Sequence, residues 1–444
     1  MSVPLIPVTI VPQKQVDECY IQLSEQLYKQ LQIETELTLI LGRSSIQVSV
    51  HTKPMLGNEI HMSEKIFIEL SLPIKKYQFL TKYDSSSHSM KLGPIIGLLM
   101  EFSPTEKKPF SRLQQFCEEL HQVVSEKGGF FYVFSCESYA QTGYYYEEGK
   151  WLSAKLPSPD VIYNRASRKL EQIPRFKKFR TGLEQQVIPL FNDRFFSKWE
   201  VNEWLREQPH LQNYLPETQI LSKESFELFV QQYDTVFIKP IHGSQGRHIT
   251  KIEKSTSNHY SFQTSIMNRT EQNLPFDQLY RKILSLLGKP IYIIQEGLSL
   301  VTIDSNPLDF RVLCHKNHEH QWVITSIVAR VGAENEIVSN IARGGTTTKP
   351  LEVLRFCFGP KKALEALDMI KELSLRIAQI TGLRSKGITG ELGIDIGVDL
   401  NGKPWLIEVN SKPSKFNDEP TGKIRPSAKA IIRFCTKLAF DYNC

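Results

Sequence analysis

The sequence predicts a mixed α/β (α+β) protein with more than one domain, on three observations. Residues 93–135 hold two short apolar runs on either side of an amphipathic stretch at 110–127, the pattern of a strand–helix–strand unit. Residues 361–381 repeat apolar side chains at helical spacing, with Leu364 in that stripe, and stop at a glycine. Residues 391–399 alternate strictly between apolar and polar side chains, which predicts a strand with one buried face.

The size and composition of the chain are those of a globular protein. Its 444 residues suit roughly two to four domains, and its 41% hydrophobic and 23% charged residues are ordinary values. No apolar run reaches membrane-spanning length and the first residues lack a signal-peptide pattern, so we expect a cytoplasmic protein without a membrane partner. The seven cysteines are odd in number and form no Cys-x-x-Cys pair, which favours a reducing compartment over a disulfide framework or zinc site.

The net charge is mildly basic. A formal charge of +6 suits anionic ligands such as nucleotides. The lysines are scattered along the sequence, so we expect no nucleic-acid partner.

Residues 1–90 are predicted to form a β-rich N-terminal module. A helix is expected over residues 15–32, and strands within 38–50, 60–72 and 78–92, where alternating and β-branched residues are separated by turn signals. The module contains no catalytic constellation, so a binding role and a purely structural role both stay open.

Residues 91–190 are predicted to form a small open α/β domain. The strand–helix–strand unit is followed by a third short strand within residues 156–165. Ligands of open parallel sheets bind at the carboxyl ends of the strands, and this strand ends in Asn164 and Arg165. These two residues are therefore either substrate contacts or structural residues.

Residues 391–413 are the stretch around which the rest of the third predicted region, residues 191–444, is organised. Asn401-Gly402 is a strong hairpin signal, and a two-residue loop there places Asp395 directly opposite Glu408. In the second strand, Ile407 and Val409 would share one face, and Leu406 and Glu408 the other.

The predicted pairing of Asp395 with Glu408 indicates a cation. Like charges facing each other across two strands are destabilising, and a cation between them reverses the sign. With Asn410 they supply hard oxygen ligands, and Mg²⁺ takes one or two carboxylates together with substrate phosphates. The alternatives are a metal–nucleotide site and a solvated acidic hairpin.

Two other stretches predict phosphate contacts. A strand at 236–240 ends in Lys239 and runs into a glycine-rich loop, whose N–H groups can close on phosphate oxygens; that loop contains Gly243, Ser244, Gln245 and Gly246. The lysine precedes the glycines, so this is not a Walker A loop, and an ordinary turn is the alternative. Lys198 stands in the first turn of a predicted helix, which is unfavourable unless an anion is present.

The order of these parts resembles the ATP-grasp superfamily. A lysine before a glycine-rich loop is followed by Gln295-Glu296-x-Leu298, then Asp309-x-Arg311, then Asn340-x-x-Arg343-Gly-Gly, and last by Asp395 and Glu408-x-Asn410. Residues 157–165, 198–200 with 215–218, and 407–413 are similar to a narrower group, the YheC/YheD family of spore-forming bacteria. The resemblance covers roughly residues 90–440.

The resemblance implies a fold and an activity. Residues 191–444 would form an ATP-grasp domain of two α+β subdomains, preceded by a pre-ATP-grasp domain at 91–190. The implied activity is an ATP- and Mg²⁺-dependent, ADP-producing carboxylate–amine ligase that works through an acylphosphate. Its carboxylate and amine substrates are not implied, although members of the family are described as endospore coat-associated, so spore-coat proteins are candidate partners.

The resemblance also implies site residues. Lys198 and Lys239 would hold ATP phosphates under the loop at 243–246, and Gln295, Glu296 and Leu298 would frame the adenine largely through their backbone. Asp395, Glu408 and Asn410 would hold two magnesium ions, with Glu408 bridging. Arg311, Arg330 and Arg343 would face the transferred phosphate and the acyl intermediate. Ser411-Lys412-Pro413 departs from the pattern that usually follows the asparagine, which puts the acceptor side in doubt.

Two functions compete. The first is the ligase, favoured because every phosphate- and metal-facing position is filled. The second is a non-catalytic nucleotide-binding or structural spore-coat protein on an ATP-grasp scaffold, since a fold does not guarantee activity. Neither Arg330 nor Arg343 has an acidic neighbour at salt-bridge spacing that explains it better, which predicts that both serve the reaction.

Overall fold

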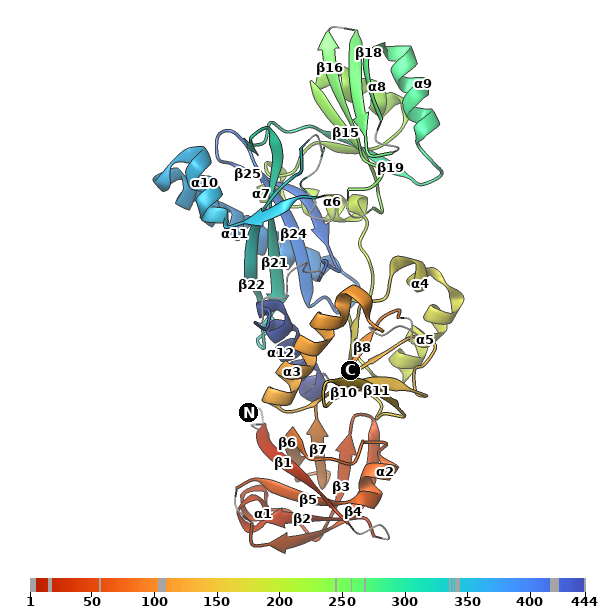
Figure 1. The fold of residues 1–444 in the computed structure, drawn as a ribbon, viewed down its shortest axis with the longest axis vertical. Coiled ribbons are helices and arrows are strands. Elements are labelled where there is room, and N and C mark those ends of the chain that lie inside the picture. Colours follow the sequence, from red (N-terminus) through yellow and green to blue (C-terminus); the bar gives the residue numbers. More distant parts are fainter. Residues whose placement is uncertain are drawn as a thin grey trace.

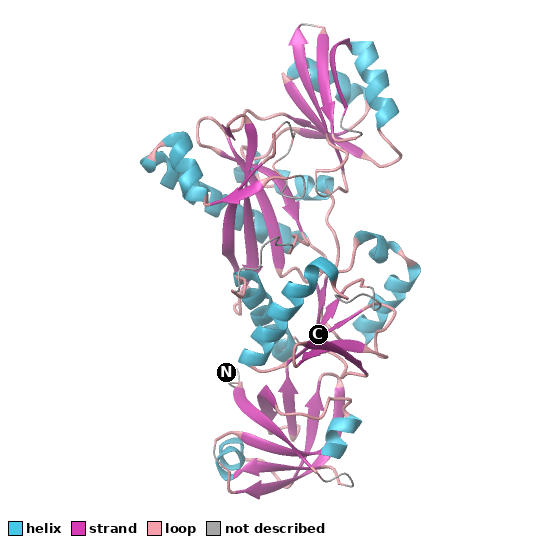
Figure 2. Cartoon of the chain, viewed as in Figure 1, coloured by secondary structure: helices cyan, strands magenta, loops and turns pink. Residues whose placement is uncertain are grey.

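The computed structural model describes residues 5–14, 18–55, 57–102, 109–243, 246–256, 258–266, 269–334, 337, 339, 344–415 and 423–442. Four β-structures follow one another along the long axis of the molecule (Figure 1). A closed barrel lies at one end, and three further sheets, each flanked by helices, succeed it (Figure 2). No helix in these ranges is both long enough and apolar enough to cross a membrane.

The N-terminal barrel contains strands β1 to β7 in the order β1-β5-β2-β4-β3-β7-β6. Its elements are β1 (Ile6–Gln13), β2 (Tyr20–Ser24), α1 (Glu25–Leu31), β3 (Glu36–Leu41), β4 (Ser44–Lys53), β5 (Glu59–Ser63), α2 (Glu64–Glu69), β6 (Tyr77–Asp84) and β7 (Ser89–Gly93). The barrel repeats one pattern: β1 pairs in parallel with β5 and β4 with β2, while β1 pairs antiparallel with β6 and β4 with β3. Closure leaves no open sheet edge in this part of the chain.

Two sequence predictions in the barrel are wrong for one shared reason. The helix expected over residues 15–32 is a strand followed by the short helix α1, and the strand expected within 60–72 is a strand followed by α2. Each switch occurs at a Ser-Glu pair, a combination that favours a helix N-terminus. At the first, the Leu27 N–H donates to Ser24 Oγ at 3.2 Å.

The second sheet has the order β11-β10-β9-β8-β12-β13. Its strands are β8 (Ile95–Leu99), β9 (Phe130–Phe134), β10 (Gly143–Glu147), β11 (Lys150–Ala154), β12 (Val161–Asn164) and β13 (Leu190–Phe191). β8 pairs in parallel with both β9 and β12. Helix α3 (Gln114–Lys127), preceded by a 3-10 turn at Ser111–Leu113, and helix α12 (Pro426–Asp441), from the far end of the sequence, share one buried cluster with this sheet. α4 (Arg168–Gln172) and α5 (Pro174–Gln185) follow β12.

The third sheet has the order β14-β19-β15-β16-β17-β18. The chain enters it through α6 (Lys198–Arg206) and α7 (Pro209–Gln212). Its elements are β14 (Thr218–Ile220), α8 (Lys223–Gln232), β15 (Thr235–Pro240), β16 (Thr250–Thr256), β17 (His259–Thr264), β18 (Arg269–Pro275), α9 (Phe276–Leu286) and β19 (Tyr292–Glu296).

The fourth sheet has the order β23-β22-β21-β24-β25, with β20 paired to β21. Its elements are β20 (Thr302–Ile303), β21 (Asn306–Lys316), β22 (Trp322–Val331), β23 (Thr346–Thr348), α10 (Pro350–Phe358), α11 (Pro360–Arg384), β24 (Glu391–Val398) and β25 (Pro404–Asn410). α11 covers one face of this sheet with Ile370, Leu373 and Ile377. Leu364, which the predicted stripe included, is half exposed because Ala363 and Ala366 fill the core position at that end of the helix.

Candidate functional site

The predicted pairing of Asp395 with Glu408 is present, but the length of the hairpin loop and the strand register differ from the prediction. The loop contains three residues instead of two, because the Asp399 N–H donates to the Lys403 carbonyl at 3.0 Å and Gly402 adopts φ +86°. The register shifts by one between Asp395 and Ile396, so a β-bulge restores the pairing with Glu408.

The bulge also changes which side chains of β25 share a face. Leu406 and Val409 belong to the buried core, although Leu406 also borders a pocket that Ile407 and Glu408 line. The prediction that Ile407 and Val409 lie together is therefore wrong, because an extra residue in one strand reverses the alternation at that point.

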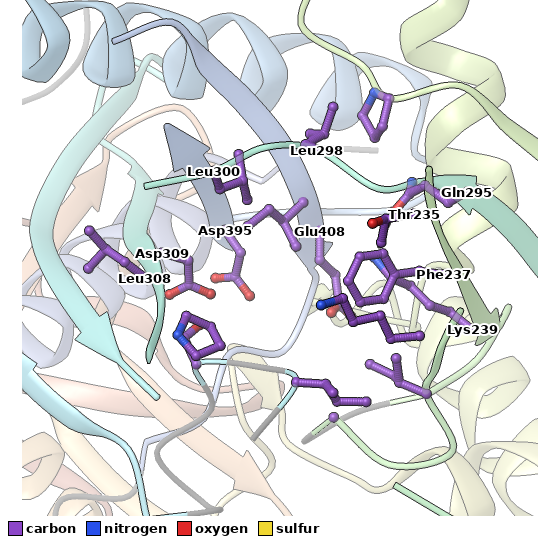
Figure 3. A pocket seen from close by; sticks show the side chains of 18 of the residues that line it. Thr235, Phe237, Lys239, Gln295, Leu298, Leu300, Leu308, Asp309, Asp395 and Glu408 are labelled. Atoms are coloured by element: carbon purple, nitrogen blue, oxygen red, sulfur yellow. Dashed lines mark hydrogen bonds between the residues drawn. The ribbon is translucent and has the colours of Figure 1, made fainter. Parts of the chain in front are cut away.

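This pocket has a volume of about 840 Å³ and lies between the third and fourth sheets. It brings together most of the residues selected from the sequence: Lys198, Lys239, Gly243, Gly246, Gln295, Glu296, Leu298, Arg330, Asp395 and Glu408. Figure 3 shows Asp309 and Asp395 side by side on one wall, Lys239 and Gln295 on the other, and Glu408 between them. Arg311 and Asn410 lie behind the pocket wall, and each contacts Asp395. Ser244, Gln245 and Arg343 fall outside the described residues.

Each of the two facing carboxylates forms ion pairs with cationic side chains of the protein. Arg311, opposite Asp395 in the register of β21 and β24, donates from Nη2 to Asp395 Oδ2 at 2.9 Å, and its Nε also bonds that carboxylate. Glu408 pairs with Lys198. Burial raises the pKa of Asp395, but Arg311 and Arg330 outweigh it and hold that pKa below its ordinary value. The expected repulsion is thus neutralised by the protein's own cations.

Arg330 has two acidic neighbours, so the prediction that it has none is wrong. Its guanidinium donates to both Asp309 oxygens, at 2.6 and 2.5 Å, and its Nη2 lies 3.1 Å from Asp395 Oδ2. Asp309 stands directly opposite Arg330 on the neighbouring strand. In the sequence, Asp309 stands out only as part of a motif, because cross-strand pairing of β21 with β22 cannot be obtained from sequence spacing.

The anion that contacts Lys198 in the free protein is the carboxylate of Glu408. It is the first residue of α6, after the N-cap Ser197, and its Nζ donates to Glu408 Oε1 at 2.9 Å and to the Gly243 carbonyl at 3.0 Å. The backbone N–H of Lys198 also donates to the Ile241 carbonyl at 2.9 Å. Lys198 therefore joins the acidic hairpin to the end of β15 and the start of the glycine-rich loop.

Lys239 lies deeper in the same pocket. Its Nζ donates to Gln295 Oε1 at 2.6 Å, across the pairing of β15 with β19. Burial, followed by repulsion from Lys198, lowers the pKa of Lys239 to about 8. A bound anion would offset both the burial of the Lys239 ammonium group and its repulsion by Lys198, because it places an opposite charge beside that group.

At the other end of the pocket, backbone donors are only partly available. The Glu296 N–H donates to the Glu217 carbonyl and the Gly297 N–H to the Thr235 carbonyl, at 2.9 and 2.8 Å. The Leu298 N–H has no hydrogen-bond partner in the described part of the chain. Apolar and hydroxyl side chains that no sequence motif singled out also line the pocket: Thr235 and Phe237 on the side of Gln295, and Leu300 and Leu308 on the side of Asp395 and Asp309 (Figure 3).

The donor set around Asp395 fits a hard cation. Within the described ranges, no group of three or more His, Cys, Asp or Glu side chains could hold a metal ion. Two facing carboxylates remain, with the Asn410 amide 3.4 Å from Asp395 Oδ2. This set matches Mg²⁺, which needs only one or two protein carboxylates when phosphates complete its coordination.

Asn164 and Arg165, the other residues singled out at a strand end, lie elsewhere. The Asn164 amide donates to Glu171 Oε1 at 3.0 Å and to the Asp193 carbonyl at 3.3 Å, which is a structural role. Arg165 Nη1 lies 3.9 Å from Glu391 Oε2, at the start of β24. Neither residue lines the pocket.

Comparison with known proteins gives one family and several distant relatives. The family model described as YheC/D like ATP-grasp matches residues 187–438. The endospore coat-associated protein YheD of Bacillus subtilis (strain 168) is 27% identical over 391 residues, 84% of each chain. The endospore coat-associated protein YheC of the same strain is 23% identical over 67% of this chain and 82% of that protein.

Two solved structures resemble the chain at lower identity. The ATP-grasp ligase PsnB complexed with minimal precursor covers 78% of this chain and 99% of its own, at 15% identity and a TM-score of 0.42. The D-alanyl-alanine synthetase A from Vibrio cholerae O1 biovar eltor covers 78% of this chain and 98% of its own, at 13% identity and a TM-score of 0.47.

Proposed function

The chain belongs to the YheC/D-like ATP-grasp family, and from this premise we propose that it is an ATP- and Mg²⁺-dependent ligase that joins a carboxylate to an amine. One observation supports the proposal above all others. A single pocket places Lys198, at the start of α6, and Lys239, on the third sheet, against the carboxylates of Asp395 and Glu408 on the fourth sheet. Lysines suit phosphates and paired carboxylates suit magnesium, so this pocket suits a magnesium–nucleotide complex.

Lys239 and Lys198 have different parts in this proposal. Lys239 keeps its place beside Gln295 and holds a phosphate as a fixed point charge. Lys198 neutralises Glu408 in the free protein and would contact the phosphates in the nucleotide complex. The Leu298 N–H and the side chains of Thr235, Phe237 and Leu300 receive the adenine.

Asp395, Glu408 and Asn410 would hold magnesium. The metal, when bound, neutralises charge on the phosphate oxygens and so favours attack at phosphorus. The Asp395 carboxylate is oriented for this by Arg311 and by Arg330, which Asp309 fixes from its other side. We therefore propose that Arg311 and Arg330 position the metal ligand, and that Arg343 faces the transferred phosphate.

The reaction would proceed in two balanced steps. An oxygen of the substrate carboxylate attacks the γ-phosphorus of ATP, forming an acylphosphate while ADP leaves with the bond electrons. The amine nitrogen of the second substrate then attacks the acyl carbon, and inorganic phosphate leaves as the C–N bond forms and the amine loses a proton. The residues named above orient the reactants and stabilise charge, which is where catalysis of phosphoryl transfer resides.

One observation supports a second function. Asp395 and Glu408 are already neutralised by arginines and a lysine in the free protein, as they would be in a nucleotide-binding or structural protein without activity. The curated relatives are named for the endospore coat, so such a protein would be a coat component.

ADP and phosphate release decides between these functions. The purified protein is incubated with Mg-ATP and panels of amino acids, peptides and spore-coat extract, with Glu408→Gln as the inactive control. The ligase predicts substrate-dependent ADP release that the control loses. ATP binding without release in any panel, and equal background in both proteins, would favour the non-catalytic alternative.

A further inference from the structure

The net positive charge of the chain is concentrated in one segment, although its lysines and arginines are spread along the sequence. Residues 165–180 contain seven of the 54 lysines and arginines and one of the 48 acids, a net charge of +6 that equals the charge of the whole protein. The remaining sequence is therefore neutral overall. This segment follows β12 and forms helix α4 and most of α5, which Figure 1 shows beside the second sheet.

Four cationic side chains of this segment are exposed, whereas Arg165 and Arg180 lie against acids outside the segment. Lys169, Lys177 and Lys178 are exposed and form no ion pair within the described residues. Arg175 is also exposed and reaches only Glu137, at 4.0 Å. Ordinary protein surfaces intersperse both signs of charge, so an unpaired basic face of this kind attracts a polyanion.

The only acid of the segment is turned inward. Glu171 accepts a hydrogen bond from Asn164 and pairs with Lys412, whose side chain is 2% exposed. Lys412 Nζ also donates to the Ala166 carbonyl at 3.2 Å. Glu171 therefore anchors α4 to the chain leaving β25 and does not neutralise the outer face.

This anchoring places the basic face next to the proposed active site. Lys412 follows Asn410 by two residues. Burial, and next to it repulsion from Arg168 of α4, lowers the pKa of His242, which adjoins Gly243. Arg168 itself makes no hydrogen bond or ion pair in the described part of the chain. Helix α4 is thus tied to the segment that follows the proposed metal ligand Asn410.

The aromatic residues of the segment favour a polypeptide over a nucleic acid. Single-stranded nucleic acids are bound by stacking on exposed aromatic rings beside the cations. Phe176 is buried and Phe179 packs against the same core, so α5 offers no such ring. Carboxylate side chains need only the cations.

We propose that the outer face of α4 and α5 is the docking surface for an acidic polypeptide, which supplies the carboxylate that the ligase activates. This inference rests on the proposed function and narrows its substrate class to glutamate- or aspartate-rich peptides or proteins. The basic face holds the acidic polypeptide by charge, and one carboxylate of that polypeptide enters the pocket beside Lys198.

Binding of a fluorescein-labelled poly-L-glutamate to the full-length protein, measured by anisotropy without ATP, tests the docking surface. The variant Arg175→Glu, Lys177→Glu, Lys178→Glu reverses the exposed face of α5. The matched control, Lys29→Glu, Lys53→Glu, Lys361→Glu, makes the same change of net charge at exposed lysines elsewhere. We expect the first to weaken binding by about tenfold or more and the control by less than about threefold, since local charge dominates over net charge.

Two outcomes would overturn the proposal: equal weakening by both triple variants, or tighter binding of a single-stranded RNA with the same number of charges than of poly-L-glutamate. Thermal melting of each variant verifies its fold. ADP release with poly-L-glutamate is measured separately, so that patch-dependent binding without any turnover upholds the docking surface and counts against the ligase.

Discussion

Strand β24 carries two carboxylates on one face, and they occupy very different surroundings. Glu391, at its start, is fully buried and is surrounded by partners: Tyr163 donates to it at 2.8 Å, His315 Nε2 lies at 2.9 Å, and Lys415 forms an ion pair with it. Asp395, four residues later, lines an open pocket opposite Glu408, whose side chain is 25% exposed.

The comparison separates a structural carboxylate from a functional one. The partners of Glu391 come from β12, β21 and the segment after β25, so one buried group holds the second and fourth sheets together. Burial raises the pKa of Glu391, yet Lys415 and His315 hold it far below its ordinary value. At the pocket end, the partner of Glu408 is a lysine on a flexible stem that can exchange for a cation. Asp395 is also fixed, by Arg311 and Arg330, so at the pocket end the carboxylate with an exchangeable partner is Glu408.

Removing the charge at the two ends should give the largest contrast. Glu391→Gln leaves Lys415 buried without its counter-charge and should cost about 3–5 kcal/mol of unfolding free energy. Glu408→Gln, partly exposed, should cost less than about 1 kcal/mol, because its pair with Lys198 is near solvent. Urea denaturation measures both. Similar losses of unfolding free energy in the two variants would contradict a mainly structural role for Glu391 that Glu408 does not share.

Lys239 should carry a large share of nucleotide binding. Lys239→Met should weaken ATP binding by about 1.5–3 kcal/mol, the range for a hydrogen bond to a charged group. Isothermal titration calorimetry measures the loss, and Lys239→Arg, which keeps the charge, is the matched control. An unchanged affinity in Lys239→Met would exclude this lysine from the phosphate site.

The pH dependence of ATP affinity should report the same lysine. Its pKa is lowered from 10.5 to about 8, so the protonated form that phosphates require is complete below pH 8 and is lost above it. Affinity should fall by up to about tenfold per pH unit above 8, with proton uptake on binding. In Lys239→Arg the fall should disappear, since a guanidinium keeps its proton.

The stability of the free protein should move in the opposite direction over the same range. The unfolded lysine binds its proton up to pH 10.5 and the folded one only to about 8, so this group lets stability rise with pH between those values. Lys412 and Lys415, each with a pKa lowered to about 8 chiefly by burial, add to the rise. Urea denaturation at pH 8 and pH 10 checks it, and a decrease would contradict the direction of these shifts.

The smallest expected effect is in the hairpin loop. Gly402 has φ +86°, and an added Cβ would lie 2.9 Å from Lys362 Cε. Gly402→Ala should cost about 1 kcal/mol of stability and leave ATP affinity unchanged, because the bulge and not the loop sets the pairing at Glu408. A parallel loss of ATP affinity would show that the loop register matters to the site.

The motif order made the family predictable, and the match of residues 187–438 to the YheC/D like ATP-grasp model confirms it together with the mixed α/β ATP-grasp fold. Short-range patterns also predicted Lys239 beside the pocket, because a strand and its adjoining loop are local. The charge partners were not predictable. Arg330 with Asp309, and Glu391 with Tyr163, depend on strand register or on contacts between sheets, to which sequence spacing is blind. The bulge at Ile407 likewise leaves no sequence signal.

Calorimetric titration with ATP, with magnesium and with a chelator in its place, tests the central claim most directly. Because Lys198 and the arginines already neutralise the carboxylates, magnesium alone should bind weakly, while Mg-ATP should bind at least about tenfold more tightly than ATP alone. Glu408→Gln should abolish that gain while retaining wild-type stability. Equal ATP affinity with and without magnesium, in the wild-type protein and in Glu408→Gln, would contradict a magnesium–nucleotide site at Asp395 and Glu408.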